Sequence, residues 1–335
     1  MKKISIYFFI LLISIGSLIS NYKVFNVNVQ QIRLSNYLSS GSIANMDLEY
    51  LERISTDYPT LSQTVIPFKA ITGTYWLQND SVIKGLNLLE KANKENPYLG
   101  FPDSMLAGFY EFIGVKDSFN YYARNAYNKL PNAPQHYVLL SKVLINEDRI
   151  DSLEIFFNDI KERIKDKQVF KIYFASAVKN QEKFDSISLS ENIQLSKSRF
   201  ARDPDITLLT DYLVYGEEKV KKLTNLKQQA IDSFNNKPDY SIKIMTEIIQ
   251  QIYDNLDNYE VLLEMHFRNG DYKEVVDIYS FLNENNAVSL KAVIIEFIAI
   301  SYVNLNDLKS GCSLALTLKN NNYNISSGLA SRCNI

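Results

Sequence analysis

Histidine and cysteine are scarce in this chain of 335 residues, which has two of each. An imidazole supports catalysis only with a partner in hydrogen-bond reach, and His136 and His266 both lie in apolar helical patterns, where packing is their simpler role. The sequence also has no glycine-rich phosphate loop, nucleophile elbow or His-Glu-x-x-His helix. Asp254 and Asp257 lack the glycine and spacing of a calcium loop. We therefore predict no catalytic residue, no cofactor and no metal site, and thus no enzyme.

Glycine and proline are also few, at 11 and 8 residues, and long periodic runs of Leu, Ile, Tyr and Phe separate them. This pattern favours helices joined by short turns. The share of charged residues, 22%, is that of an ordinary globular protein. The net charge of −2 comes without a concentrated basic surface, so we expect no nucleic-acid partner.

Charge is missing altogether from Ile4 to Ser20, directly after Lys2 and Lys3. As a helix this segment would be roughly 25 Å long, the short end of what crosses a bilayer. Residues 1–23 are thus either a single-pass membrane anchor or a cleaved signal peptide. In both cases the two lysines stay in the cytoplasm and the rest of the chain is exported. The predicted location is a bacterial-type inner membrane with the C-terminal region periplasmic, or the periplasm itself after cleavage.

Both cysteines, Cys312 and Cys333, lie close to the C-terminus. In an exported chain such a pair can form a disulfide, whereas in a reducing compartment it would stay as two thiols. The hypothesis is that a disulfide holds the C-terminal tail on the last helical hairpin. Metal binding is less well supported, because neither histidine nor a third cysteine is near.

One residue pattern is written twice between Ile66 and Pro131, with a period of 34 residues. Small, aromatic and proline positions recur at this distance. The matched pairs are Gly73 and Ala107, Trp76 and Tyr110, Leu88 and Tyr122, Ala92 and Ala126, and Pro97 and Pro131. Two helices cross closely only where small residues such as Gly73 and Ala92 face bulky ones such as Trp76 and Leu89.

This pattern resembles the tetratricopeptide (TPR) repeat, a helix–turn–helix unit of 34 residues. The resemblance covers roughly residues 28–200 and 256–319, and begins with a degenerate unit from Asn28 to Pro59. It implies an all-α solenoid of antiparallel helix hairpins, preceded by the N-terminal hydrophobic helix. Because Asp203-Pro204-Asp205 interrupts the pattern, we predict a repeat array over 28–200 and a second helical region over 205–335.

The resemblance also implies a concave face, formed by the first helices of successive hairpins, that holds an extended peptide or a partner helix. The residues expected on this face are Thr74, Leu77, Gln78, Gly108, Glu111, Phe112, Lys142 and Asn146. The predicted function is a membrane-anchored, extracytoplasmic scaffold that binds partner proteins and is held in the membrane by residues 4–20.

A looser resemblance links residues 67–131 to the repeat region that trails O-antigen ligase/polymerase-type membrane proteins. Those proteins carry many membrane spans, whereas this chain has at most one, so their glycosyl-transfer chemistry cannot be carried over. The alternative function is accordingly an accessory role in envelope polysaccharide assembly, with a glycan or its membrane enzyme as the partner.

Overall fold

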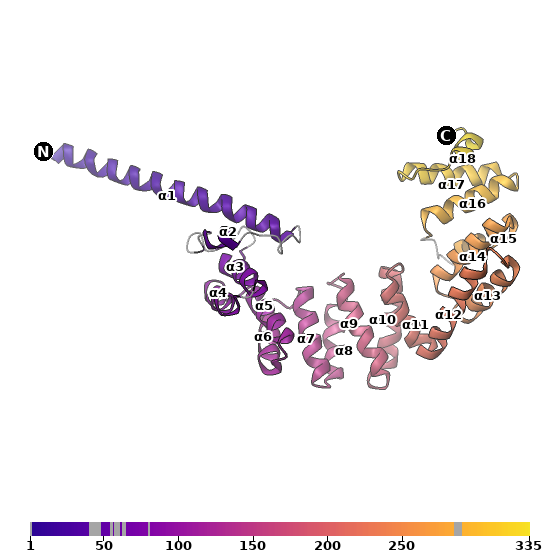
Figure 1. Ribbon diagram of the computed structural model, residues 1–335, viewed down its shortest axis with the longest axis horizontal. Helices are drawn as coiled ribbons and strands as arrows, with labels where there is room; N and C mark the ends of the chain where they lie inside the picture. Colours follow the sequence, from indigo (N-terminus) through magenta and orange to yellow (C-terminus); the bar gives the residue numbers. More distant parts are fainter. Residues whose placement is uncertain are drawn as a thin grey trace. The chain divides into compact units, whose positions relative to one another are not determined.

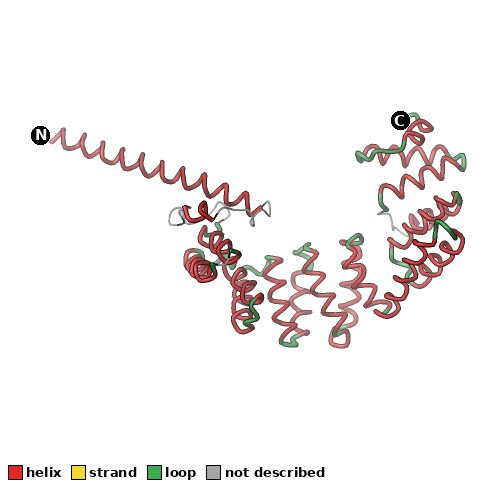
Figure 2. Tube along the Cα trace, in the orientation of Figure 1, coloured by secondary structure: helices red, strands yellow, loops and turns green. Residues whose placement is uncertain are grey.

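The computed structural model describes residues 2–39, 48–53, 56, 61, 65–79, 81–284 and 290–335. All regular elements in these ranges are helices, apart from a single antiparallel bridge between Leu61 and Pro67 (Figures 1 and 2). The chain divides into two compact units. Unit 1 is Met1–Ser176 with Glu182–Phe184, and unit 2 is Ala177–Gln181 with Asp185–Ile335. The division lies earlier in the chain than the break predicted at residues 203–205.

In unit 1 the helices from α3 to α8 follow one another as hairpins, preceded by α1 and the short α2 (Figure 1). The helices are α1 Lys2–Ser39, α2 Leu48–Arg53, α3 Phe68–Gln78, α4 Val82–Glu95, α5 Phe101–Phe112, α6 Lys116–Lys129, α7 Pro134–Asn146 and α8 Ile150–Ile160. Helix α9, Lys167–Lys179, and the short 3-10 helix η2, Gln181–Lys183, run across the division. Within unit 1, α3 packs on α4 and α5 on α6, while α3, α5 and α7 also contact one another in sequence. The predicted all-α architecture of stacked hairpins is confirmed.

The crossing of α3 and α4 shows why small residues recur in this pattern. A Cβ added to Gly85 would lie 2.8 Å from the carbonyl oxygen of Gly73 and 2.8 Å from Cγ of Leu77. A Cβ on Gly73 would in turn lie 3.0 Å from the carbonyl oxygen of Gly85. The two glycines therefore allow the backbones to touch, and fully buried Leu89 and Ala92 fill the space beside them.

The N-terminal helix differs from the prediction in one respect. Helix α1 is continuous from Lys2 to Ser39, so the apolar segment and the expected first helix of the degenerate repeat form one element. The physical reason is that neither glycine nor proline occurs from Ser17 to Ser39 to end the helix. Leu34 of α1 is completely buried against Phe68 and Tyr75 of α3. Within the degenerate unit predicted from Asn28 to Pro59, the structure also has the short helix α2, and Pro59 lies outside the described residues.

Unit 2 contains a less regular series of helices. They are α10 Ser186–Phe200, α11 Pro204–Tyr215, α12 Glu217–Ser233, α13 Pro238–Gln251, α14 Leu256–Asn269, α15 Tyr272–Glu284, α16 Ala292–Asn304, α17 Leu308–Asn320 and α18 Ser327–Cys333. The pairs α12–α13, α14–α15 and α16–α17 pack as hairpins, and α11, α12 and α13 form the run of three helices that precedes α14. The break at Asp203 is a helix start, because its carboxylate accepts hydrogen bonds from the backbone N–H groups of Asp205 and Ile206.

Candidate functional site

The face predicted as a partner groove lies on α3, α5 and α7 of unit 1. Gln78, Gly108, Phe112 and Asn146 are exposed there, and Phe112 keeps 88% of its surface accessible. A Cβ added to Gly108 would meet no atom within 4 Å, so this part of α5 is open. The face thus presents a bare aromatic ring beside an unobstructed stretch of backbone.

A salt bridge joins two helices across this face. Nζ of Lys142 on α7 donates to both carboxylate oxygens of Glu111 on α5, at 2.8 and 2.9 Å. Each side chain is 39% exposed, so the pair contributes at most about 1 kcal/mol to stability. The salt bridge joins successive hairpins. Because Glu111 and Lys142 are paired with each other, a partner on this face would meet two charges that already neutralise one another.

Two of the residues expected on this face are engaged within their own hairpin. Leu77 is half-buried, and its side chain lies where a Cβ on Gly85 of α4 would be. The hydroxyl of Thr74 donates to the carbonyl oxygen of Ala70, 2.9 Å away and one helical turn earlier. The sequence placed both on the right helix, but it could not resolve which side of α3 each would occupy.

A cavity of about 540 Å³ lies in unit 2, where the three-helix run meets the start of α14. We call it the α11–α14 cavity. Its apolar wall consists of Leu208, Val220, Leu223, Ile248, Ile252 and Leu256. Its charged lining consists of Arg202, Asp211, Lys227, Asp257, Glu260 and Lys291. The cavity therefore combines a broad apolar surface with a few fixed charges, as ligand sites in proteins do.

Asp211 of α11 is the most unusual group in this lining. The residue is 3% exposed, and its Oδ2 accepts a hydrogen bond of 2.7 Å from the side-chain amide of Asn255. Its Oδ1 is buried and has no hydrogen-bond donor among the described residues. Burial raises the pKa of Asp211 to about 6, although the bond from Asn255 and the charges of Lys197 and Lys227 oppose the rise.

The other five charges of the lining form ion pairs at the edge of the cavity. Glu260 is bridged by Arg202 at 3.0 Å and by Lys291 at 2.7 Å. Asp257 is bridged by Lys227 and Lys291, each at 2.9 Å. Burial opposes ionisation of Asp257, but these two cations outweigh it and lower its pKa to about 2. In this lining a salt bridge is thus absent only from Asp211.

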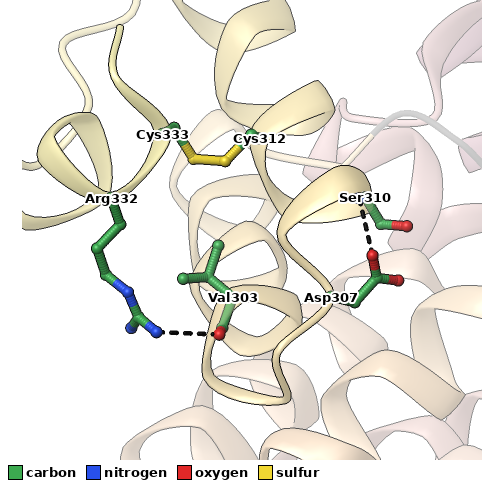
Figure 3. Close-up of a disulfide and its surroundings, with 6 residues drawn as sticks. All are labelled: Val303, Asp307, Ser310, Cys312, Arg332 and Cys333. Atoms are coloured by element: carbon green, nitrogen blue, oxygen red, sulfur yellow. Dashed lines mark hydrogen bonds between the residues drawn. A yellow bond between two sulfur atoms is a disulfide. The ribbon is translucent and has the colours of Figure 1, made fainter.

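The C-terminal cysteines lie at the end of unit 2 (Figure 3). Cys312 of α17 and Cys333 of α18 are joined by a disulfide, with their Cα atoms 5.2 Å apart. Arg332 donates from Nη2 to the carbonyl oxygen of Val303, 3.0 Å away near the end of α16. Leu329 of α18 is 3% exposed and packs in the same cluster as Val303. The disulfide, the arginine and the leucine together hold α18 over the end of the last hairpin.

Both histidines have structural contacts. Nδ1 of His136 lies 3.2 Å from the carbonyl oxygen of Leu130, in the turn before α7. Its imidazole is 5% exposed, and this burial lowers its pKa. Nδ1 of His266 lies 3.2 Å from Oδ2 of Asp271, in the turn after α14. Each imidazole thus helps to hold a turn beside its helix, in keeping with the packing role predicted from the sequence.

Comparisons with known proteins bear on the fold alone. No protein-family model and no curated protein matches this sequence. A solved tetratricopeptide repeat protein from Parabacteroides merdae is similar, with a TM-score of 0.36 and 7% identity over 80% of this chain and 96% of that one. So is the TPR domain of P58(IPK), with a TM-score of 0.35 and 11% identity over 92% of this chain and 96% of that one.

The packing of the helices makes this chain an all-α protein of successive helix hairpins, the architecture of TPR-like solenoids. The looser resemblance to O-antigen ligase/polymerase-type proteins gains no support from these matches.

Sequence reasoning missed the α11–α14 cavity. The boundary predicted at Asp203 coincides with the start of α11, whose residues line this cavity. One further signal was available, because Asp211 lies in a largely apolar helical stretch from Ile206 to Leu213. An aspartate in such a stretch is either buried or at the edge of a polar face, and a buried one needs a partner.

Proposed function

We propose that this protein is a non-enzymatic scaffold that is anchored in a membrane by α1 and binds partner proteins outside the cytoplasm. The observation that carries the proposal is the combination of stacked helix hairpins with an apolar helix whose N-terminal segment lies outside their core. The most apolar 18-residue window within residues 8–34 of α1 has a mean hydropathy of 1.7, and none of this window is buried. Side chains such as Phe9, Leu12 and Leu18 keep more than half of their surface exposed.

The direction of insertion is inferred from charge and from the disulfide. Lys2 and Lys3 precede the apolar segment, and cationic flanks stay on the cytoplasmic side. The disulfide between Cys312 and Cys333 is stable only in an oxidising compartment. Both observations support a periplasmic or extracellular place for the repeats, with the N-terminus inside.

Anchoring and topology can be tested on the full chain in membranes. We expect the protein to stay in the pellet after alkaline carbonate extraction and its intact mass to include residues 1–23. An added protease should digest the repeats from the periplasmic side alone. Extraction into the soluble fraction with a shortened N-terminus would show a cleaved signal peptide and refute the anchor.

The partner face can be tested by crosslinking. A photoreactive amino acid at Gly108 or Phe112 on α5 should capture protein partners, while one at Ile155, an exposed position on α8, serves as the control. Reversing the charges of Glu111 and Lys142 together keeps their salt bridge but inverts its direction, and we expect a changed set of crosslinks. An unchanged set would remove the groove assignment, and recovery of polysaccharide in place of protein would favour the accessory role in envelope assembly.

A further inference from the structure

We propose that the α11–α14 cavity is a binding site for the side chain of a lysine or arginine of a partner protein, with the carboxylate of Asp211 as its anion. This inference rests on the proposed scaffold function and names the chemistry by which one partner would be recognised. Unit 2 alone provides the site, because all of the lining residues belong to this unit.

Asp211 receives fewer hydrogen bonds than an ionised carboxylate can accept. An ionised carboxylate has room for several hydrogen bonds, yet Asp211 receives one, from the neutral amide of Asn255. Its buried Oδ1 meets no donor among the described residues. A buried acceptor without a donor costs free energy and calls for an explanation. A donor supplied by a bound partner would give that explanation.

The lysines whose charges act on Asp211 are each paired with another acid. Lys227 could have served as the partner of Asp211, but its Nζ donates to Asp257 and Asn258, at 2.9 Å each. Lys197 is paired with Asp254, which also accepts a hydrogen bond of 2.6 Å from the hydroxyl of Tyr215. The nearest cations are therefore bound to other acids, and Asp211 is left for an external one.

The lining of the cavity matches the shape of a lysine or arginine side chain. Lysine and arginine carry a cation at the end of an apolar stem. The lining offers aliphatic side chains along this stem, including Leu223, Ile248 and Ile252, and a carboxylate for its end. A neutral aliphatic chain would leave Asp211 unsatisfied, and an acidic one would add a second negative charge beside it. The cavity thus selects a cation with an aliphatic stem.

Asn255 links this site to the fold. Its Oδ1 accepts a hydrogen bond from the backbone N–H of Asp257 and so caps α14, while its Nδ2 holds Asp211. The carboxylate is consequently fixed by a helix start and does not depend on a flexible loop. Because Asp211 is already held in place, less conformational entropy is lost when a ligand binds to it.

The test uses the full chain in detergent micelles with ¹³C-labelled isoleucine methyl groups. Ile231, Ile248 and Ile252 line the cavity and report on it, while Ile71 and Ile164 of unit 1 serve as references. The probes are N-acetyl-lysine methylamide, its arginine equivalent, and N-acetyl-norleucine methylamide, which keeps an aliphatic stem without the charge. We expect saturable shifts of the lining methyls with both cations, and binding at least tenfold weaker for norleucine.

Three variants sharpen the result. Asp211→Asn should weaken binding of the cationic probes by about tenfold or more, which is the effect of losing one charge-assisted hydrogen bond. Thr224→Trp should block the cavity, because Thr224 lines it and is exposed. Asp277→Asn, an exposed acid on α15, should bind as the wild type does.

The assignment is wrong if the lining methyls do not move, if norleucine binds as well as lysine, or if Asp211→Asn binds unchanged. It is also wrong if maltose, a neutral sugar, shifts these methyls and the cations do not. None of these outcomes depends on membrane anchoring or on the face of unit 1. The cavity assignment can therefore be refuted while the proposed scaffold function stands, and the scaffold function can be refuted while the cavity assignment stands.

Discussion

Replacing Asp211 by asparagine should stabilise the protein at neutral pH, against the usual expectation for a buried polar residue. The wild-type carboxylate is ionised while buried, with one oxygen unpaired. Asparagine has nearly the same shape and can still accept the hydrogen bond of Asn255, but it carries no charge. The variant therefore keeps the contacts and removes the cost of desolvating an anion.

The magnitude follows from the pKa. Its rise from 3.8 to about 6 in the folded state corresponds to a cost of about 3 kcal/mol when the group is ionised in both states. This cost is present in full above the folded pKa. It is relieved as the pH falls through 6, because the folded protein then takes up a proton that the unfolded chain does not. Between pH 7.5 and pH 5 the wild type should regain about 1.4 kcal/mol from this group.

Urea unfolding followed by circular dichroism at these two pH values tests the reasoning. We expect Asp211→Asn to exceed the wild type by as much as about 3 kcal/mol at pH 7.5, and by about half of that at pH 5. Other titrating groups act on both proteins and cancel in the difference. Asp277→Asn should change the free energy of unfolding by less than about 0.5 kcal/mol at either pH. A difference that is independent of pH, or a less stable variant at pH 7.5, would refute the account of Asp211.

Three further predictions concern the packing of each unit. Gly85→Ala should destabilise unit 1 by about 1–3 kcal/mol through overpacking, because its new Cβ would lie 2.8 Å from the carbonyl oxygen of Gly73. In the matched variant Gly108→Ala the new Cβ meets open space, so the protein should become more stable by about 0.5–1 kcal/mol. Thermal and urea unfolding measure both changes. Leu34→Ala should cost about 2–5 kcal/mol and increase amide exchange in α3, and unchanged exchange would show that α1 does not dock there. Replacing both Cys312 and Cys333 by serine should lower stability by about 3 kcal/mol in oxidising buffer, and a reductant should abolish the difference from the wild type.

The hairpins could be predicted from the sequence because their signal is local and repeated. Gly73 and Ala92 recur as Ala107 and Ala126, and a fixed period identifies each helix crossing without knowledge of the partner helix. The join between the membrane segment and the first helix could not be predicted in this way. Helix α1 continues through Lys23, because a single charge does not end a helix and no glycine or proline follows it before Ser39.

The cavity could not be predicted, because it depends on distances between helices that are not neighbours in any repeat. Asp211 on α11, Lys227 on α12 and Asp257 on α14 come together only through the packing of α11, α12 and α13 before α14. The sequence shows where the repeat pattern stops, but not how the helices beyond that point pack. It likewise placed Leu77 on the correct helix without showing that the side chain turns toward α4.

The α11–α14 cavity and the unsatisfied carboxylate of Asp211 have a common physical meaning. Unit 2 leaves a cavity beside Ile248 and Ile252 and places in it an acid whose burial costs free energy. Neither feature helps the helices to pack, and both become favourable once a cation with an aliphatic stem fills the space. A bound cation would offset the same desolvation cost of the Asp211 carboxylate that Asp211→Asn removes.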